Sequence, residues 1–178
     1  MAWEDSLFGY LDDLENQAEA LYDAQRAPEL ADRGRAEYQQ VRLAARLMAS
    51  TDEQVSLEVL GLGTVAGRLA RVCDGWVLVG GHGQEWLIAT SAIVSVAGAS
   101  ERAVPEVAWP AVSRLRITSP LRGLADAALP CVAHLVDGSR HEGVVHRVGA
   151  DFIEFLVAGG GRTVLIALAH LAAVQSRP

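Results

Sequence analysis

Histidine is the residue type that most suggests chemistry here, because four of the five copies fall within residues 131–174. Neutral imidazole is a common metal ligand, and zinc or copper sites need several such nitrogens to converge. His134, His141, His146 and His170 have no thiol or carboxylate at a ligand-like spacing beside them. We therefore expect scattered surface histidines, no metal site and no cofactor.

Two glycine-rich segments, Gly80–Gly83 and Gly159–Gly161, raise the alternative of a phosphate-binding loop. Such loops bind phosphate where a strand leads into a helix whose free N–H groups face the anion. Apolar segments typical of strands flank both loops on each side, so hairpin turns are the favoured interpretation.

Nucleophilic catalysis has equally little support in the sequence. Cys73 and Cys131 show no metal-type spacing. The chain also lacks a Gly-x-Ser-x-Gly turn, a His-Glu-x-x-His pair and an evident pairing of cysteine with histidine. We expect both thiols to be buried and reduced, and we expect a protein that is not an enzyme.

The elements that carry these residues occur twice, which is the sign of a tandem repeat. Gly143–Phe155 aligns without a gap with Gly67–Val79, and the glycine, the Arg-Val pair and an aromatic residue coincide. The match extends upstream, and it extends downstream after two additional residues in the second glycine loop. Each copy predicts five short strands, whose even spacing is typical of a small barrel.

The N-terminal region has a different composition from the repeats. Apolar residues recur at helical spacing over residues 5–26 and again over about 28–49, with Pro28 between them, which predicts a helical hairpin. The whole net charge of −7 lies in residues 1–53, and residues 54–178 are neutral. A neutral repeat region disfavours a general phosphate-binding surface. The acidic hairpin is either a solvated surface or an arm that binds a basic partner.

These observations predict an α+β protein that is mainly β, with four segments. Residues 1–50 form the acidic helical hairpin and residues 51–98 the first five-stranded barrel. Residues 99–118 form a linker. Residues 119–178 form a short helix, capped by Ser119 with Pro120 in its first turn, followed by the second barrel. Gly67 and Gly143 are expected where a bent strand tolerates no side chain.

A helix followed by a five-stranded bent barrel, with Gly-x-Leu/Val in its second strand and Asp151-Phe152-Ile153-Glu154 in its third, resembles the Sm-like family. The resemblance implies an RNA-binding scaffold. It also implies pairing between the fourth strand of one barrel and the fifth strand of its neighbour. Glu154 stands where the family has asparagine, and in the first repeat Trp76 matches the aromatic position. The scaffold positions are thus retained, and the base-contacting positions are not.

Eight residues are candidate contacts for RNA or a protein partner. Arg71 and Arg147 occupy equivalent positions in the two repeats, although each could equally lie at a strand end beside a nearby acid. The full set is Arg68, Arg71, Trp76, Arg147, Asp151, Phe152, Glu154 and Arg162.

We expect a non-enzymatic assembly or adaptor module, in which the two barrels pair with each other. Near-continuous apolar strands such as Val164–Leu168 imply further self-association or a protein partner at the barrel edges, unless the hairpin caps those edges. The alternatives are an RNA-binding regulator that uses non-standard surfaces and a sensor of small ligands. The absence of a signal sequence and of a membrane-spanning apolar run favours a cytoplasmic location.

Overall fold

The computed structural model describes Leu14, Glu15, Gln17, Asp32 and residues 34–81 and 83–177. The chain divides into two compact units, Met1–Val41 and Arg42–Pro178. In the first unit the described residues up to Tyr38 are helical. Most of the predicted helix over 5–26, and with it the predicted hairpin, lies outside the described residues.

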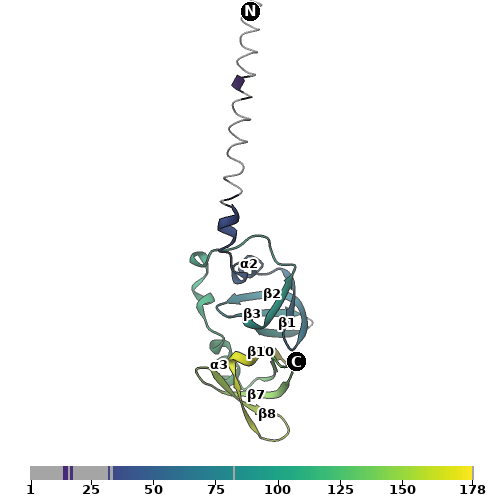
Figure 1. Cartoon of the computed structure of the whole chain (residues 1–178). Coiled ribbons are helices and arrows are strands. Elements are labelled where there is room, and N and C mark those ends of the chain that lie inside the picture. Colours follow the sequence, from purple (N-terminus) through teal and green to yellow (C-terminus); the bar gives the residue numbers. More distant parts are fainter. Residues whose placement is uncertain (1–13, 16, 18–31, 33, 82, 178) are drawn as a thin grey trace, which may run out of the picture. The chain divides into compact units, whose positions relative to one another are not determined.

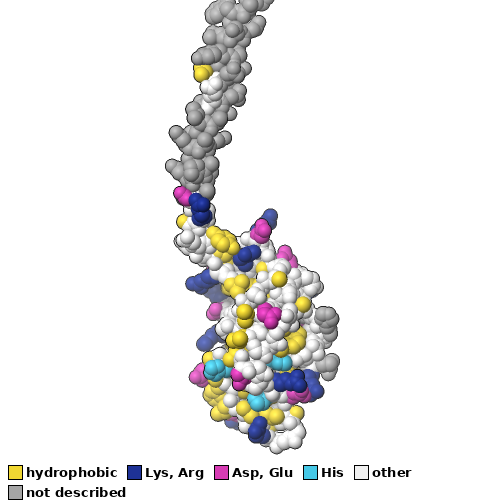
Figure 2. Space-filling model, turned by 45° about the vertical axis from the view of Figure 1, so that its right-hand side comes forward, with side chains coloured by type: hydrophobic (Ala, Val, Ile, Leu, Met, Phe, Trp, Pro, Cys, Tyr) yellow, Lys and Arg dark blue, Asp and Glu magenta, His cyan; other side chains and the backbone are white. Residues whose placement is uncertain are grey.

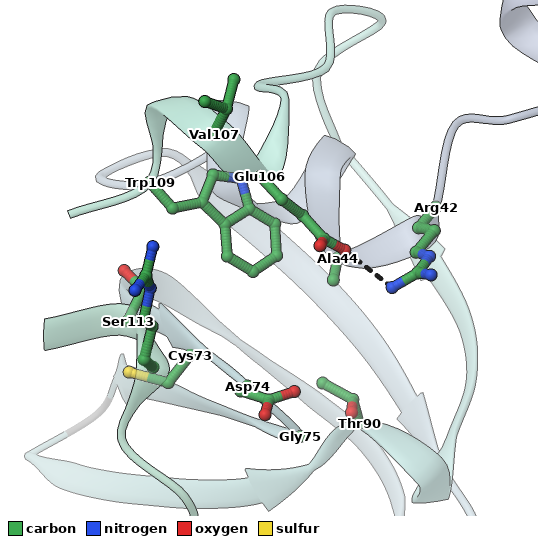
Figure 3. Close-up of a pocket in the computed structure, with 11 residues that line it drawn as sticks. Arg42, Ala44, Cys73, Asp74, Gly75, Thr90, Glu106, Val107, Trp109 and Ser113 are labelled. Carbon is green, nitrogen blue, oxygen red and sulfur yellow. Dashed lines mark hydrogen bonds and ion pairs between the residues drawn. The ribbon is translucent and has the colours of Figure 1, made fainter. Parts of the chain in front are cut away.

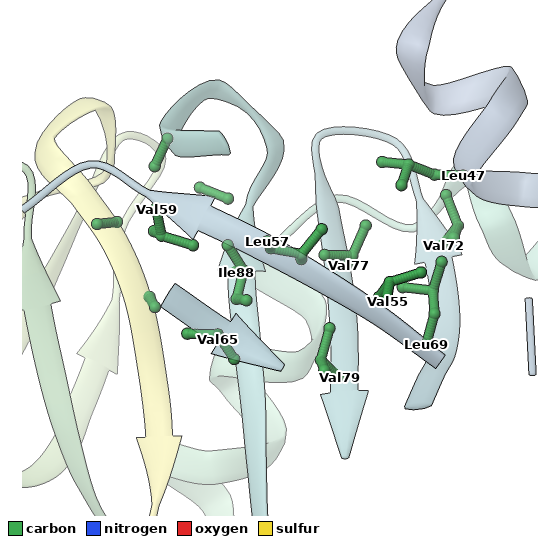
Figure 4. Packing of buried hydrophobic residues seen from close by; sticks show 14 residues of the cluster. Leu47, Val55, Leu57, Val59, Val65, Leu69, Val72, Val77, Val79 and Ile88 are labelled. Carbon is green, nitrogen blue, oxygen red and sulfur yellow. The ribbon is translucent and has the colours of Figure 1, made fainter. Parts of the chain in front are cut away.

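The second predicted helix, over 28–49, is interrupted. A turn follows Tyr38, and Arg42 has an extended backbone with φ −88° and ψ 151°. Helix α2 then runs from Leu43–Ala49. Leu47 is completely buried and packs among strand residues of the first repeat, as Figure 4 shows. The last part of the predicted helix therefore covers the core of the larger unit.

Ten antiparallel strands form one continuous sheet (Figure 1). In chain order they are β1 Gln54–Val59, β2 Gly63–Cys73, β3 Trp76–Gly81, β4 Gln84–Ala89, β5 Ile93–Ala97, β6 Pro130–Leu135, β7 Arg140–Val148, β8 Phe152–Val157, β9 Thr163–Ala167 and β10 Leu171–Ser176. Their order across the sheet is β5-β1-β2-β3-β4-β10-β6-β7-β8-β9. A mainly β protein is thus confirmed. No described helix is both long and apolar enough to cross a membrane.

The two halves of the sheet have the same internal order, with the fifth strand at one side and the fourth at the other. Their irregularities also coincide. The register between the second and third strands shifts around Ala70 in the first half and around His146 in the second. These bulges occupy equivalent positions of the sequence repeat, so the repeat is structural down to its local distortions.

The prediction of two closed five-stranded barrels is wrong. In neither half does the fourth strand pair with the fifth strand of the same half. Instead β4 pairs with β10, with Ile88 opposite Ala173 and Leu87 opposite Val174. The backbone groups of β4 and β10 are thereby satisfied between the halves, which leaves one open sheet. The expectation that the two halves pair with each other is confirmed.

The hydrophobic core follows this shared sheet. One cluster contains the apolar residues of the first half together with Ala172 and Ala173 of β10 (Figure 4). The other contains the second half together with Cys73, Trp76 and Leu87 of the first. Each half thus contributes side chains to the core of the other, and the halves cannot separate without exposing apolar surface.

Three short 3-10 helices lie in or beside the described loops of the first half and linker, namely η1 Thr90–Ala92, η2 Glu106–Ala108 and η3 Ala111–Arg114, and η4 Leu168–His170 precedes β10. Helix α3 spans Thr118–Asp126, and its Leu121 is completely buried. With Ser119 as its cap the helix would begin at Pro120, but it begins at Thr118 and has no side-chain cap, so the predicted capping role of Ser119 is wrong. Pro120 does lie in the first turn.

Two equivalent glycines allow the close approach of neighbouring strands. A Cβ at Gly67 would lie 2.5 Å from the carbonyl oxygen of Gly80, and a Cβ at Gly143 would lie 2.0 Å from that of Leu156. Both contacts are with backbone atoms, which cannot turn aside. The expectation that these positions tolerate no side chain is confirmed.

We predict that Gly143→Ala lowers the free energy of unfolding by about 1–3 kcal/mol, because the added methyl group overpacks two paired strands. Gly80→Ala is the matched control, since Gly80 is also a strand glycine but a Cβ there would meet no atom within 4 Å. Denaturant unfolding of both variants measures the difference. Equal stability of the two variants would contradict the placement of Gly143.

Candidate functional site

The internal junction between β4 and β10 shows how an edge strand of one half pairs with an edge strand of the other. Leu87 of β4 and Ala172 of β10 are 5% and 0% exposed, because each packs against the opposite half. The equivalent strands, β9 and β5, are the two outer edges of the sheet. Within the described residues neither outer edge pairs with a further strand.

Apolar side chains stand exposed at both outer edges. Leu165 of β9 is the repeat equivalent of Leu87, and it is 67% exposed. Val94 of β5 is the equivalent of Ala172, and it is 64% exposed. The positions that the internal junction buries are therefore open at the ends of the sheet. No charged residue occurs in β9 or β5 to discourage strand pairing.

A hollow of about 450 Å³ lies along the β9 edge. Val164–Ala167 form one wall, and Leu135, Val136, Asp137, His141 and His170 form the rest. Hydrogen bonds from the Ser139 hydroxyl and backbone N–H hold the pKa of Asp137 below its usual value. The β9 edge thus offers an apolar strand beside a small polar rim.

A pocket of about 700 Å³ lies between the β2–β3 turn and the linker. Figure 3 shows the Trp109 indole projecting into it from the linker, and Arg42 paired with Glu106 at 2.7 Å. The linker is fixed here because Asp74 N–H donates to the Ser113 carbonyl at 2.7 Å. Charges of both signs line the pocket, and none of its described lining residues is a histidine.

The one thiol in this pocket, Cys73, is not an activated nucleophile. Burial raises its pKa, an effect only partly offset by the charge of Arg71. A thiol that stays protonated at neutral pH is a poor nucleophile. What the pocket does show is the place where the linker is fixed against the first half of the sheet, through the Asp74–Ser113 hydrogen bond.

The candidate contacts of the first repeat lie on or beside β2. Arg68 pairs with Asp52 at 2.7 Å, and both side chains are exposed. Arg71 is exposed and follows the bulge of β2. Trp76 is buried, and its indole N–H donates to the Leu115 carbonyl at 2.7 Å. Trp76 therefore binds the linker from inside the protein.

The candidates of the second repeat lie around the β7–β8 hairpin and the β9 edge. Arg147 stands opposite Glu154 in the strand register, and Asp151 accepts a hydrogen bond at its carbonyl from Leu168 N–H at 2.8 Å. Phe152 is half-buried against Gly149. Arg162 is exposed where the β8–β9 loop meets β9. The structure thus brings Arg147, Asp151, Phe152 and Glu154 into one hairpin, separate from the β2 residues.

Both glycine loops join antiparallel strands, which confirms the hairpin interpretation. His141, His146 and His170 are at least partly exposed, but His134 is buried, so the expectation of surface histidines is wrong for this residue. Among the described residues, no group of three or more histidine, cysteine or acidic side chains could hold a metal ion.

Sequence reasoning missed the linker contacts and the importance of the exposed apolar residues. Trp109, Ser113 and Leu115 lie in a segment without clear periodicity, and only the tryptophan hinted at a packed structure. The equivalence of Val94 to Ala172 follows from the sequence repeat, but the position of both residues at strand bulges and the exposure of Val94 do not. For β9, the uncharged run Val164–Leu168 was a usable signal.

Both cysteines are buried and free, as expected. Burial raises the pKa of Cys131 from 9.0 to about 11. The folded state thus holds the thiol proton more tightly than the unfolded state does, and this contribution to stability is complete below pH 9.0 and lost as the pH rises to about 11. We predict that the free energy of unfolding falls over this range by about 1–2 kcal/mol more than in Cys131→Ala. Denaturant unfolding at pH 8, 9, 10 and 11 measures this, and parallel pH profiles of both proteins would contradict it.

Comparison with known proteins gives no family to which the chain can be assigned: no protein family matches it, and no curated protein matches it.

Proposed function

We propose that this protein is a non-enzymatic assembly module that self-associates head to tail through the outer edges of its sheet. The observation that carries this proposal is the exposure of Leu165 and Val94. Their repeat equivalents, Leu87 and Ala172, are buried where β4 meets β10. Pairing β9 of one copy with β5 of the next would bury both residues in the same way.

The internal junction also supplies the register of the proposed contact. Ile88 opposite Ala173 becomes Ile166 opposite Ser95 of the next copy, and Leu87 opposite Val174 becomes Leu165 opposite Val96. Because the two edges are different surfaces, the contact is heterologous. Such a contact closes into a ring or continues as a filament, depending on the rotation between copies.

Pairing of a fourth with a fifth strand between neighbouring copies is also what a resemblance to the Sm-like family implies. The strand order that the two halves share supports this relationship as a proposal. One local difference concerns the turn beside the junction. Gly61 approaches the Leu135 carbonyl oxygen closely, whereas the second repeat has Asp137 at the aligned position. In the proposed contact between copies, the turn that contains Asp137 must therefore stand further from the strand of the next copy than the Gly61 turn stands from Leu135.

The proposal of an RNA-binding regulator has less support. On the face shown in Figure 2, arginine side chains are scattered among acidic ones and do not form a basic patch. Arg68 is paired with Asp52. Affinity for nucleic acid depends mainly on the number of phosphates that arginine or lysine neutralises. Binding to short RNA at physiological salt, if measured, is expected to be weaker than micromolar.

We predict that the full-length protein shows a mass above 18.9 kDa that rises with concentration in size exclusion coupled to light scattering. Leu165→Lys and Val94→Lys should each restore the monomer mass, because an exposed edge lysine must be buried on strand pairing. Both side chains are already exposed, so the fold should tolerate these changes.

Val107→Lys is the matched control, because Val107 is 92% exposed and lies in the linker, away from both edges. It should leave self-association unchanged. A wild-type mass that stays at 18.9 kDa at every concentration would refute the proposal and would indicate that another segment, such as the N-terminal one, caps the edges. Copurified RNA that is lost at high salt would instead favour the RNA-binding alternative.

A further inference from the structure

A chain of polar side chains spans the internal junction. His134 Nε2 lies 3.0 Å from Gln175 Oε1, and Gln175 Nε2 donates to Gln84 Oε1 at 2.8 Å. These residues come from β6, β10 and β4. The series of hydrogen bonds therefore crosses the pairing of β6 with β10 and the pairing of β10 with β4, which is the internal junction. Glu85 N–H also donates to the Ser176 hydroxyl across the same strands at 2.8 Å. The internal junction is thus held by neutral groups.

The strand registers identify the residues that occupy these places at the outer edges. Ser95 and Ala173 are equivalent in the two repeats. Glu58 stands opposite Ser95 and His134 stands opposite Ala173, so Glu58 is the equivalent of His134. Ala97 is in the same way the equivalent of Gln175. Arg162 is the equivalent of Gln84. In the first half Gly81 pairs with Gln84, and in the second half the equivalent of Gly81 is Val157, whose N–H donates to the Arg162 carbonyl. The neutral chain is replaced by an acid, a small residue and a base.

The charges of Glu58 and Arg162, and the small size of Ala97 between them, are compatible with a direct contact between copies. Arg162 is exposed and forms no ion pair with any described residue. Glu58 is half-buried and accepts a hydrogen bond from the Thr64 hydroxyl at 2.7 Å, which leaves other carboxylate lone pairs free. Ala97 leaves open the space that the Gln175 amide fills internally. The arginine side chain is also longer than glutamine, so it can reach across that space.

We propose that Glu58 of one copy and Arg162 of the next form an ion pair across the outer junction, and that this pair selects head-to-tail association. The inference rests on the proposed self-association through β9 and β5. An exposed ion pair adds little affinity by itself. It adds specificity, because it opposes wrong registers and edge pairings that bring like charges together.

The pair also accounts for the difference between the two kinds of junction. Inside one chain the partner is always present, and neutral hydrogen bonds suffice to hold the strands in register. Between copies, the two edges must find each other in solution among other exposed strands. Opposite charges at the ends of the two edges favour that encounter and reject two identical edges, β5 with β5 or β9 with β9.

Charge reversal tests the ion pair in the full-length protein by sedimentation velocity over a concentration series. Glu58→Arg and Arg162→Glu should each weaken self-association at least about tenfold, because each places like charges together. The double variant Glu58→Arg with Arg162→Glu should recover the wild-type dissociation constant to within about threefold. Glu101→Arg and Arg102→Glu, exposed charges outside both edges, are the matched controls and should change nothing.

Mixing the two single variants gives the sharpest result. At one junction the arginine introduced by Glu58→Arg would meet the glutamate introduced by Arg162→Glu, and at the next junction the unchanged Arg162 would meet the unchanged Glu58. The equimolar mixture should therefore assemble more tightly than either variant alone. If both single variants self-associate like the wild type, the ion pair is refuted and the edge pairing stands. If the wild type itself is monomeric at every concentration, the proposed self-association is refuted.

Discussion

Backbone hydrogen bonding at the ends of a β-sheet is the constraint on which this structure depends. Each five-stranded half has a fourth and a fifth strand with unpaired N–H and C=O groups on one side, and such edges attract other strands. The chain satisfies one of each by pairing β4 with β10. The same pairing makes the sheet continuous and directs Leu87 into the second core and Ala172 into the first. Sheet, core and domain unity therefore follow from one contact between two strands that are far apart in sequence.

The close approach of strands within each half imposes the next requirement. Gly67 and Gly143 stand where a Cβ would collide with a neighbouring carbonyl oxygen, and the bulges at Ala70 and His146 follow three residues later in both halves. A glycine with a nearby bulge lets a long second strand bend sharply while its ladder continues. The linker then fixes the first half from outside, since Trp76 donates to the Leu115 carbonyl from within the core.

The local part of this architecture could be predicted from residue patterns, whereas the pairing of the two halves was expected from the family resemblance and not from a pattern within either strand. The repeat alignment around Gly67 and Gly143, continued downstream after two additional residues, located all ten strands approximately, because hairpins are set by alternation, turns and neighbours in sequence. Whether β4 pairs with its own β5 or with β10 is a choice between non-local partners of similar apolar character, and no pattern within either strand decides it. The interruption before α2 was missed for a related reason. Residues 39–42 carry no proline or glycine, and packing of Leu47 onto the sheet overrides their helical tendency. Among the candidate contacts, Arg162 was named as one of four arginines in the repeats, whereas the partner position, Glu58, emerges only from the strand register.

The way in which the outer edges differ from the internal junction bears on function. Proteins that keep edge strands apart place lysine, proline or inward-pointing charges on them. Here Val94 and Leu165 remain exposed in strands without charge. Charged residues lie beside both edges: Glu58 stands opposite Ser95 of β5, Glu154 stands opposite Leu165 of β9, and Arg162 directly precedes β9. In the proposed contact between copies, Glu58 meets Arg162, and the opposite charges favour this orientation over the pairing of two identical edges. The strands β5 and β9 themselves contain no proline and no lysine or other charged residue, and the exposed Val94 and Leu165 are the side chains that the proposed head-to-tail pairing would cover.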